Sequence, residues 1–346
     1  MMKKDALLPK RKDDHLRINL EEDVQSTVTT GFEKIHLKQK SLPELNFEHI
    51  DLSLTLFKKR LNAPILISAM TGGSERGAAL NRVLARAAEQ CGIAMGVGSQ
   101  RAAIEYPELA ETFQIRKYAP KTLLFANLGA VQLNYGYGID ECKKAVDMLE
   151  ADALYVHLNP LQEALQPEGK HNFSDLFRKI EPICKALPVP VLVKEVGWGI
   201  DLDTARKLLE VGVAGIDVAG AGGTSWAKVE MYRQTDPHKA AINAAFTEWG
   251  IQTAENLMRL RELDGNPLIF ASGGLQDGVD LAKALALGAK LGGFARKLLL
   301  AANRGEVELV KQIEIIKSQL KVSMFICGVG SLSGWNIANL DSIEQP

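Results

Sequence analysis

Four side chains that could move protons or bind a metal follow directly on a short apolar run. The run, residues 153–156, is typical of a buried β-strand, and it is followed at once by His157, Asn159, Gln162 and Glu163. His157 could be a general acid, and Glu163 could bind Mg²⁺, which prefers oxygen ligands and often also binds substrate phosphates. A lone histidine near a strand end is more often structural, but this cluster favours a functional role.

Lys194 follows another apolar run, residues 190–193, and the sequence leaves its role open. If the side chain points into an enclosed site, its ammonium could balance a negatively charged ring system. It could instead form a Schiff base with a carbonyl substrate. A third possibility is a surface ion pair with the neighbouring Glu195.

Glycine-rich segments occur late in the chain, at residues 220–223, 273–274 and 292–293. Without a Cβ, glycine lets backbone N–H groups approach a phosphate closely, and helix N-termini favour its negative charge. One such segment alone could serve only a tight turn, but three of them favour phosphate binding. No Gly-Lys-Ser or Gly-Lys-Thr follows, so the pattern is not that of a nucleotide-binding P-loop.

These polar residues belong to a series of short apolar runs that alternate with segments of helical apolar spacing. Eight such units predict parallel strands closed into a (β/α)8 barrel, an α/β fold that carries its chemistry at the carboxyl ends of the strands. We expect helices over residues 76–91, 139–150, 202–211, 281–287 and 306–320. The expected strands cover residues 64–69, 93–97, 123–126, 153–156, 190–193, 215–218, 267–271 and 290–294.

One domain accounts for all 346 residues, because a single α/β barrel with additions can reach this length. We expect an N-terminal extension over residues 1–60, the barrel over residues 61–305, and a C-terminal helix and tail over residues 306–346. A long loop between strands six and seven, residues 220–250, could be a lid. The charged residues 11–17 could form a solvated surface segment or a basic arm that closes over a phosphorylated ligand.

Composition indicates an ordinary soluble protein, with 46% hydrophobic and 24% charged residues. The formal net charge of -1 gives no reason to expect nucleic acid as a partner. The four cysteines are too far apart for a metal motif, so we expect reduced thiols in a cytoplasmic protein. The opening Met-Met-Lys-Lys-Asp leads into further charges, unlike a signal peptide. The most apolar region, residues 281–302, carries several basic residues, unlike a membrane span.

Taken together, these motifs make the chain resemble the type 2 isopentenyl-diphosphate isomerases, the FMN-dependent form, from about residue 10 to residue 335. The Gly-Gly-Thr and Ser-Gly-Gly elements occur in many FMN barrels. The string His-x-Asn-x-x-Gln-Glu and the Arg-Lys pair near the N-terminus are much more specific. The matching segments are residues 11–15, 68–73, 96–101, 127–129, 157–163, 194–197, 219–226 and 271–274.

The resemblance implies a role for each of these positions. His157, Gln162 and Lys194 would be catalytic, and Glu163 would bind Mg²⁺. FMN would lie across the barrel mouth, with its ring and ribityl chain bound by Ala69, Met70, Thr71, Ser99, Asn127, Lys194 and Thr224. Its phosphate would be bound by Gly273, Gly274, Leu275, Ala295 and Arg296. The substrate would be bound by Arg11, Lys12, His15, Arg101, His157, Asn159 and Gln162.

The reaction implied by the resemblance is the reversible isomerisation of isopentenyl diphosphate to dimethylallyl diphosphate in isoprenoid biosynthesis. Reduced FMN, formed with NADPH, would act as acid and base, with Mg²⁺ bound to the diphosphate. The resemblance also implies a homo-oligomer, usually a tetramer or an octamer. From charge and composition we expect neither nucleic acid nor a membrane as partner.

Two other functions are compatible with parts of the pattern. An FMN-dependent 2-hydroxy-acid oxidase or dehydrogenase shares the barrel and the cofactor. It needs a base histidine near an arginine late in the barrel, and residues 272–274 have neither close by. A non-catalytic barrel that only binds phosphometabolites would leave His157, Gln162 and Glu163 without a purpose.

Overall fold

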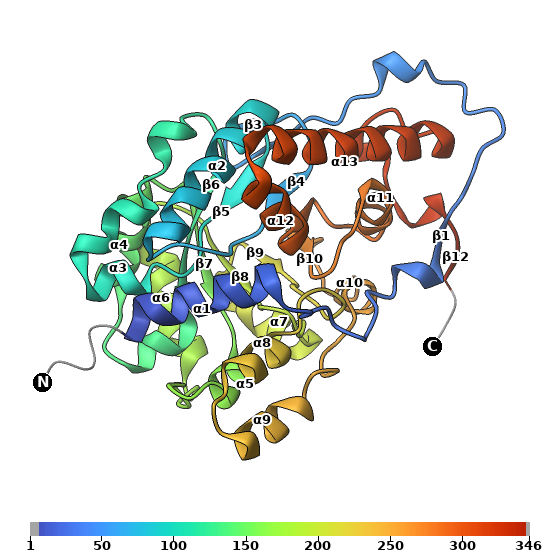
Figure 1. Ribbon diagram of the computed structural model, residues 1–346. Helices are drawn as coiled ribbons and strands as arrows, with labels where there is room; N and C mark the ends of the chain where they lie inside the picture. Colours follow the sequence, from blue (N-terminus) through green and yellow to red (C-terminus); the bar gives the residue numbers. More distant parts are fainter. Residues whose placement is uncertain (1–6, 344–346) are drawn as a thin grey trace, which may run out of the picture.

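Eight parallel strands close into a barrel, which confirms the predicted α/β barrel fold. The computed structural model describes residues 7–343, so the opening Met-Met-Lys-Lys-Asp, which led us to expect no signal peptide, lies outside them. The barrel strands are β4 (Ile65–Ile67), β5 (Ala94–Gly96), β6 (Leu124–Gly129), β7 (Ala153–His157), β8 (Val191–Lys194), β9 (Gly215–Asp217), β10 (Ile269–Ser272) and β11 (Leu291–Phe294). Each strand pairs with its neighbour in sequence, and β11 closes the barrel against β4 (Figure 1).

The barrel has an apolar floor. Side chains alternate between the two faces of each strand, and those that point inward include Phe125, Tyr155 and Phe270, all fully buried. The rings of Phe125 and Tyr155 stack at 4.7 Å. A hairpin of β2 (Leu54–Leu56) and β3 (Lys59–Leu61) packs against this cluster. The apolar filling therefore leaves only the carboxyl ends of the strands open for polar side chains.

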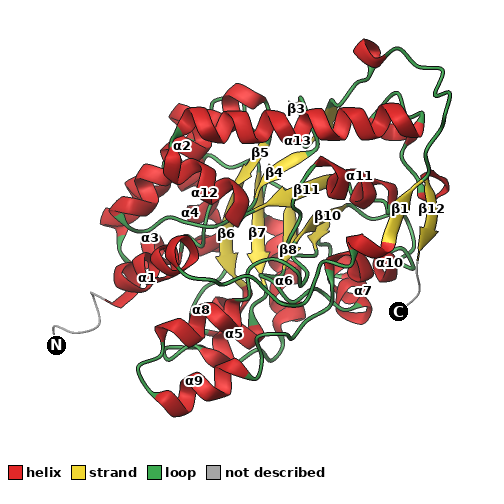
Figure 2. Cartoon of the chain, turned by 45° about the vertical axis from the view of Figure 1, so that its right-hand side comes forward, coloured by secondary structure: helices red, strands yellow, loops and turns green. Residues whose placement is uncertain are grey.

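Helices surround the barrel, and most begin and end close to the residues expected from apolar spacing (Figure 2). Helix α13 is longer than expected. It continues beyond residue 320 to Cys327, because the first residue able to adopt the left-handed conformation easily, Gly328 (φ 68°), follows there. The helices around the barrel are α2 (Glu75–Cys91), α4 (Ile139–Leu149), α6 (Leu176–Ala186), α7 (Leu202–Glu210), α10 (Thr253–Leu260), α11 (Gly278–Ala286), α12 (Arg296–Arg304) and α13 (Glu306–Cys327).

The extension and the long loop both contribute helices at the open end of the barrel. The extension contains α1 (Leu7–Glu21), and the loop contains α8 (Trp226–Arg233) and α9 (Pro237–Ala244). Helix α1 packs against α8, α12 and α2, and α8 packs against α5 (Pro160–Leu165). The remaining short elements are α3 (Arg101–Glu105) and the 3₁₀ helices η1 (Phe32–Lys34), η2 (Phe47–His49), η3 (Pro107–Phe113), η4 (Arg116–Tyr118), η5 (Ala130–Asn134), η6 (Leu332–Gly334) and η7 (Ile337–Asn339).

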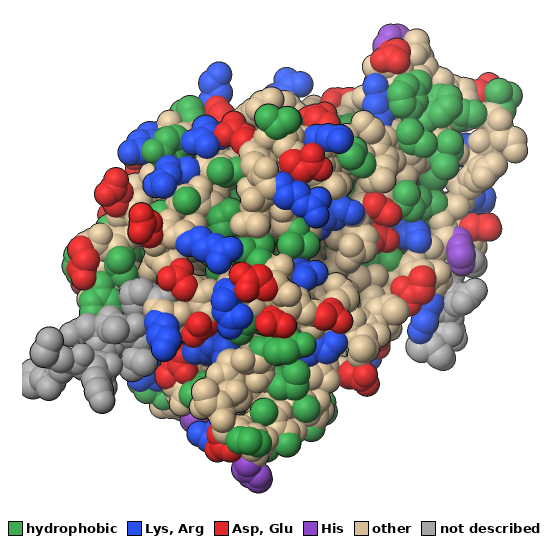
Figure 3. Space-filling view, viewed as in Figure 1, with side chains coloured by type: hydrophobic (Ala, Val, Ile, Leu, Met, Phe, Trp, Pro, Cys, Tyr) green, Lys and Arg blue, Asp and Glu red, His purple; other side chains and the backbone are tan. Residues whose placement is uncertain are grey.

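A segment that follows α1 meets the C-terminal end of the described chain in a small sheet, where β1 (Ile35–Leu37) pairs antiparallel with β12 (Leu340–Ile343) (Figure 2). Lys and Arg side chains are mixed with Asp and Glu on the surface in Figure 3, in keeping with the formal net charge of -1. All four cysteines are free thiols, buried or half-buried, as expected. Within residues 7–343 no helix is both long enough and apolar enough to cross a membrane.

Candidate active site

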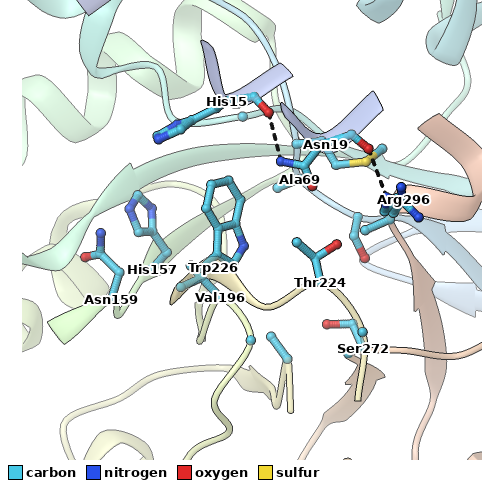
Figure 4. Close-up of a pocket in the computed structure, with 18 of the residues that line it drawn as sticks. His15, Asn19, Ala69, His157, Asn159, Val196, Thr224, Trp226, Ser272 and Arg296 are labelled. Atoms are coloured by element: carbon cyan, nitrogen blue, oxygen red, sulfur yellow. Dashed lines mark hydrogen bonds between the residues drawn. The ribbon is translucent and has the colours of Figure 1, made fainter. Parts of the chain in front are cut away.

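The loops that follow the barrel strands surround a cavity of about 340 Å³ (Figure 4). Parallel strands bring their carboxyl ends together, which is why residues far apart in sequence meet here. Every residue to which the family resemblance gave a role lines this cavity, although the individual roles stay predictions. These residues are Arg11, Lys12, His15, Ala69, Met70, Thr71, Ser99, Arg101, Asn127, His157, Asn159, Gln162, Glu163, Lys194, Thr224, Gly273, Gly274, Leu275, Ala295 and Arg296. Gly292 and Gly293, which the glycine pattern also linked to phosphate binding, lie within β11 and do not line it.

His157, the last residue of β7, is held as a neutral ring. Its Nδ1 lies 2.8 Å from Asn127 Oδ1, and Asn127 Nδ2 donates to Val97 O. The amide oxygen must therefore accept a hydrogen bond from Nδ1–H, which leaves Nε2 as the acceptor of the neutral ring. Burial, together with the charges of Lys194 and Lys12, lowers the pKa of His157 to about 3.

Helix α5 arranges Asn159, Gln162 and Glu163. Pro160 is the first residue of this helix, where its missing N–H costs no helical hydrogen bond. Asn159 Nδ2 donates to Gln162 Oε1 at 3.2 Å and to Glu163 Oε1 at 3.1 Å. The second carboxylate oxygen of Glu163 accepts from the backbone N–H of Lys170. The early turn of the helix thus holds all three side chains in one hydrogen-bonded group.

Glu163 and Asn159 offer oxygen atoms of the kind that Mg²⁺ binds. The Glu163 side chain lines the cavity, and Asn159 Oδ1 is buried without a hydrogen-bond partner. A carboxylate with a free amide oxygen nearby fits a hard cation. Residues 7–343 contain no group of three or more His, Cys, Asp or Glu that could hold a metal ion. An ion at Glu163 would therefore take further ligands from substrate oxygens or water.

Three cations line the cavity together: Arg11 and Lys12 of α1, and Arg101 of α3. Lys12 Nζ donates to Ser99 O at 3.3 Å. Burial, with repulsion from Arg11 and Arg101, lowers the pKa of Lys12 to about 7. Like charges this close repel unless an anion lies among them, so the cluster fits a polyanion such as a diphosphate. The alternative of a solvated surface segment is therefore wrong for Arg11 and Lys12.

Glu230 of α8 forms hydrogen bonds to residues that line the cavity, although it does not line the cavity itself. It is fully buried and accepts hydrogen bonds from His15 Nε2 at 2.9 Å, Gln162 Nε2 at 3.2 Å and Arg233 Nη1 at 2.6 Å. Although burial alone would raise the pKa of Glu230, the bonds and charges of His15 and Arg233 hold it at about 2. The His15 ring in turn meets the edge of Trp226, with ring centres 5.1 Å apart (Figure 4).

Lys194, the last residue of β8, lies in register with His157 of β7 and Asp217 of β9. Its side chain is 6% exposed, and Nζ donates to Glu195 O at 2.6 Å. The Glu195 carboxylate is also buried, and its Oε2 accepts three backbone N–H groups. The expected alternative of a surface ion pair between Lys194 and Glu195 is therefore wrong.

The glycine segments after β9 and β10 pack against each other. Gly273 (φ 103°) and Gly274 (φ 85°) both adopt left-handed conformations that disfavour other residues. A Cβ at Gly273 would collide with the backbone of Gly220, and one at Gly274 would collide with Gly222. Close backbone packing therefore already requires these glycines, and Gly273 and Gly274 also line the cavity.

The cavity walls near α12 and β4 fit an anionic cofactor with hydrogen-bonding groups. Helix α12 begins after Ala295, whose side chain gives no cap, so its first N–H groups can bind an anion. Arg296 donates from Nε to Asn19 O at 2.9 Å and from Nη2 to Glu22 O at 3.1 Å, at the C-terminal end of α1. Ser68 Oγ, in the cavity wall after β4, is buried without a partner, and a ligand would satisfy it.

Comparison with known proteins identifies the family of the chain. Residues 148–341 match the family model described as FMN-dependent dehydrogenase. The chain is 51% identical over 336 residues to an isopentenyl-diphosphate delta-isomerase of Nostoc sp., which covers 97% of this chain and 94% of that protein. It is 49% identical to the enzyme of the same name from Stutzerimonas stutzeri, over 98% of both chains. The chain belongs to the type 2 isopentenyl-diphosphate delta-isomerases.

Solved structures of more distant proteins share the fold of this isomerase. A flavocytochrome b2 variant matches with a TM-score of 0.67 at 20% identity, over 96% of this chain and 86% of that one. A mandelate oxidase variant matches with a TM-score of 0.62 at 16% identity, over 96% and 92%. At these identities the likeness shows the barrel fold alone.

Sequence reasoning about this isomerase missed the residues that hold its cavity side chains in place. Glu230 lies within the long loop, and Gln166, which accepts from Arg11 Nη1 at 3.4 Å, follows the recognised motif. Asp217 lies within an expected strand, residues 215–218, and a carboxylate in such an apolar run was a signal that could have singled it out. Glu230 carried no comparable signal, because an acidic residue in a loop of mixed composition is usually solvated.

Proposed function

We propose that this protein interconverts isopentenyl diphosphate and dimethylallyl diphosphate with bound reduced FMN, and with Mg²⁺ on the diphosphate. The single observation that carries the proposal is the convergence on one cavity of a cation cluster, a carboxylate with free oxygen ligands nearby and a buried lysine. Near 50% identity to isomerases over almost the whole chain gives the reaction class. Assembly as a tetramer or octamer remains a prediction from the family resemblance, and a cytoplasmic location remains a prediction from the cysteine pattern.

FMN fits the cavity across the barrel mouth, with its phosphate end near the start of α12. When bound and reduced, it would supply a proton donor and acceptor at its N5 position beside an electron-rich ring. The residues that would hold the ring and ribityl chain are Ala69, Met70, Thr71, Ser99, Asn127, Lys194 and Thr224. Gly273, Gly274, Leu275 and the first N–H groups of α12 would hold the phosphate. NADPH would supply the reducing equivalents.

The substrate diphosphate would lie among Arg11, Lys12 and Arg101. Glu163 would hold Mg²⁺, and the free oxygen of Asn159 would accept from a metal-bound water or bind the ion. An anion in this position offsets the repulsion among the three cations and so anchors one end of the substrate. The isoprene end would then reach the side chains of His157 and Gln162.

The chain's own residues position the reacting carbons and exclude water. Gln162 is held from both sides, by Asn159 and by Glu230, so its amide has little freedom. His157 has a pKa of about 3 without ligand, and so it can donate a proton only after a nearby diphosphate raises that pKa. In the neutral ring, Nε2 serves as an acceptor. Helix α1 carries cavity residues over the barrel mouth, which shields the site from solvent.

The hydroxy-acid oxidase alternative requires a base histidine and an arginine late in the barrel. The histidines that line the described cavity are His15 of α1 and His157 of β7, and neither follows β10. Both are engaged within the protein, His15 by Glu230 and His157 by Asn127. This arrangement gives no support to hydroxy-acid oxidation.

The test is proton NMR of isopentenyl diphosphate incubated anaerobically with the protein, FMN, Mg²⁺ and NADPH. We expect dimethylallyl diphosphate to appear, and we expect its formation to stop when flavin is omitted or Mg²⁺ is chelated. A parallel incubation with lactate and mandelate tests the oxidase alternative. Bound flavin with no conversion of isopentenyl diphosphate, or oxidation of either hydroxy acid, would overturn the proposal.

A further inference from the structure

Asp217 is a buried carboxylate to which the proposed reaction gives no role. It is the last residue of β9, is fully buried, and is not among the residues that line the cavity. The register of β8 and β9 places it directly beside Lys194, which does line the cavity. In a parallel sheet, residues in register on neighbouring strands point to the same side. Asp217 and Lys194 therefore both lie at the top of the barrel interior.

Two hydroxyl groups fix the Asp217 carboxylate in place. Its Oδ2 accepts from Tyr155 OH at 3.3 Å, and its Oδ1 accepts from Ser272 Oγ at 2.5 Å. Tyr155 belongs to the apolar floor, where its ring stacks on Phe125. Ser272 lies in the cavity wall (Figure 4). The carboxylate thus lies between the apolar floor and the polar cavity, where it cannot turn away from its neighbours.

Lys194 needs a negative charge nearby to stay protonated. Burial lowers the pKa of Lys194, and the charges of Asp217 and then Glu195 oppose this effect. Burial raises the pKa of Glu195 to about 7, so its carboxylate is only partly ionised near neutral pH. His157, on the other side of Lys194, is neutral there. Burial raises the pKa of Asp217 as well, and the charge of Lys194 and the hydrogen bond from Ser272 oppose this effect. Of the two carboxylates that favour the charged form of Lys194, Asp217 has the larger effect.

The two side chains act on each other without direct contact. Lys194 Nζ donates to Glu195 O, and none of the ion pairs among residues 7–343 joins it to Asp217. An ammonium that is not bonded to its counter-ion keeps N–H groups free for a ligand in the cavity. Two buried charges in register on neighbouring strands still interact strongly, because little water lies between them to screen the interaction.

We propose that Asp217 is the counter-ion that keeps Lys194 protonated, and that Asp217 thereby sets how strongly the cavity favours an anionic aromatic ring over a neutral one. This inference rests on the proposed function, in which that ring is reduced FMN. Asp217 is then a positioning residue that acts through Lys194. It explains why the barrel retains a fully buried carboxylate just outside the cavity.

The test is the midpoint potential of bound FMN in Asp217→Asn, measured from about pH 6 to about pH 9. If Lys194 loses its proton in the variant, the anionic reduced ring is bound about tenfold less tightly than in the wild type, which lowers the two-electron potential by about 30 mV. Lowering the pH restores the charge on Lys194, so the difference in midpoint potential between Asp217→Asn and the wild type disappears or reverses. If Lys194 stays charged without Asp217, the loss of a negative charge raises the potential at every pH, and the proposal is overturned.

Matched variants separate a charge effect from a structural one. Tyr155→Phe removes a hydrogen bond to Asp217 without changing its charge, and we expect its potential to shift far less than that of Asp217→Asn. In a Lys194→Met background, Asp217→Asn should no longer lower the potential, because the residue through which it acts is gone. A decrease that persists in this background would contradict the proposal. Asp217→Ser, a second neutral replacement, serves if Asp217→Asn does not fold, and it carries the same expected shifts.

The isomerase assay on the wild-type protein keeps this inference separate from the proposed function. Wild-type protein that isomerises its substrate, while its Asp217 variants keep the wild-type potential, overturns only the inference. Wild-type protein that binds FMN with the expected dependence on Asp217, yet converts no isopentenyl diphosphate, overturns only the proposed function.

Discussion

Lys12 is a cation whose charge changes near neutral pH. Its pKa of about 7 reflects burial and the repulsion of Arg11 and Arg101. An anion bound among these residues would cancel the repulsion and raise the pKa of Lys12. Binding of a diphosphate should therefore be coupled to uptake of a proton by Lys12 above pH 7. This proton uptake should make the affinity for the diphosphate depend on pH.

We expect inorganic pyrophosphate to bind more weakly as the pH rises above 7, by up to about tenfold for each unit, since one additional proton must be taken up. Calorimetry in buffers of different ionisation enthalpy measures this uptake directly. Lys12→Met is the matched variant, because the proton uptake that remains in it comes from the ionisation of pyrophosphate itself. Equal proton uptake in the variant and the wild type would remove Lys12 from this role.

Glu163 is the carboxylate whose neutralisation should separate metal binding from flavin binding. We expect Glu163→Gln to lower Mg²⁺-dependent isomerisation by roughly 100-fold or more, since one carboxylate ligand is lost. FMN should remain bound, as read from its absorbance after gel filtration. Glu181→Gln removes the same charge from an exposed position of α6 and should be active. Retained activity in Glu163→Gln would exclude the metal role.

At the scale of elements, α1 is held over the cavity near its middle and at its C-terminal end. Its first turns contribute Arg11, Lys12 and His15, and His15 is bound to Glu230 of α8. Its C-terminal carbonyls accept from Arg296, a cation at the negative end of the helix dipole. Two charged side chains of other helices, Glu230 of α8 and Arg296 of α12, therefore hold α1 in place.

We expect Arg296→Met to increase hydrogen exchange in α1 by at least about tenfold, since two charge-assisted hydrogen bonds of about 1.5 to 3 kcal/mol each are lost. Exchange is measured by mass spectrometry, with and without FMN, so that an effect through the cofactor can be recognised. Arg17→Met is the control, because the Arg17 ion pairs with Glu21 and Glu22 are exposed. Equal exchange in the two variants would show that Arg296 does not hold the helix.

For the whole molecule, buried ionisable groups are concentrated at the open end of the barrel, above the apolar floor. His157, with a pKa of about 3, and Glu230, with a pKa of about 2, bind protons more readily when unfolded, so each destabilises the fold as the pH falls. Glu195, with a pKa of about 7, binds a proton more readily in the folded protein. It therefore stabilises the fold as the pH falls from about 7 to the pKa that Glu195 has in the unfolded chain. The contributions of His157 and Glu195 oppose each other in mild acid.

The free energy of unfolding should therefore change little between about pH 6.5 and about pH 4.5, and then fall steeply by more than about 1.4 kcal/mol per unit. Urea unfolding at a series of pH values measures this profile. In Glu195→Gln the opposing contribution is absent, so stability should begin to fall already near pH 6.5. An unchanged profile in this variant would contradict the assigned titration of Glu195.

The sequence by itself determined the barrel, the strand-end residues and the family. Apolar runs and helical spacing are local signals, and parallel strands necessarily bring their carboxyl ends to one rim. His157, Lys194 and Gly273 can therefore be placed together from the sequence alone. Only the tertiary structure decided which partners hold those residues. Arg296 bonds to a carbonyl 277 residues away, and Glu230 bonds to His15 across 215 residues. Such pairs depend on how helices pack over the barrel, and no local sequence pattern predicts that packing. The sequence around a charged residue is similar whether its side chain is solvated or buried in the folded protein.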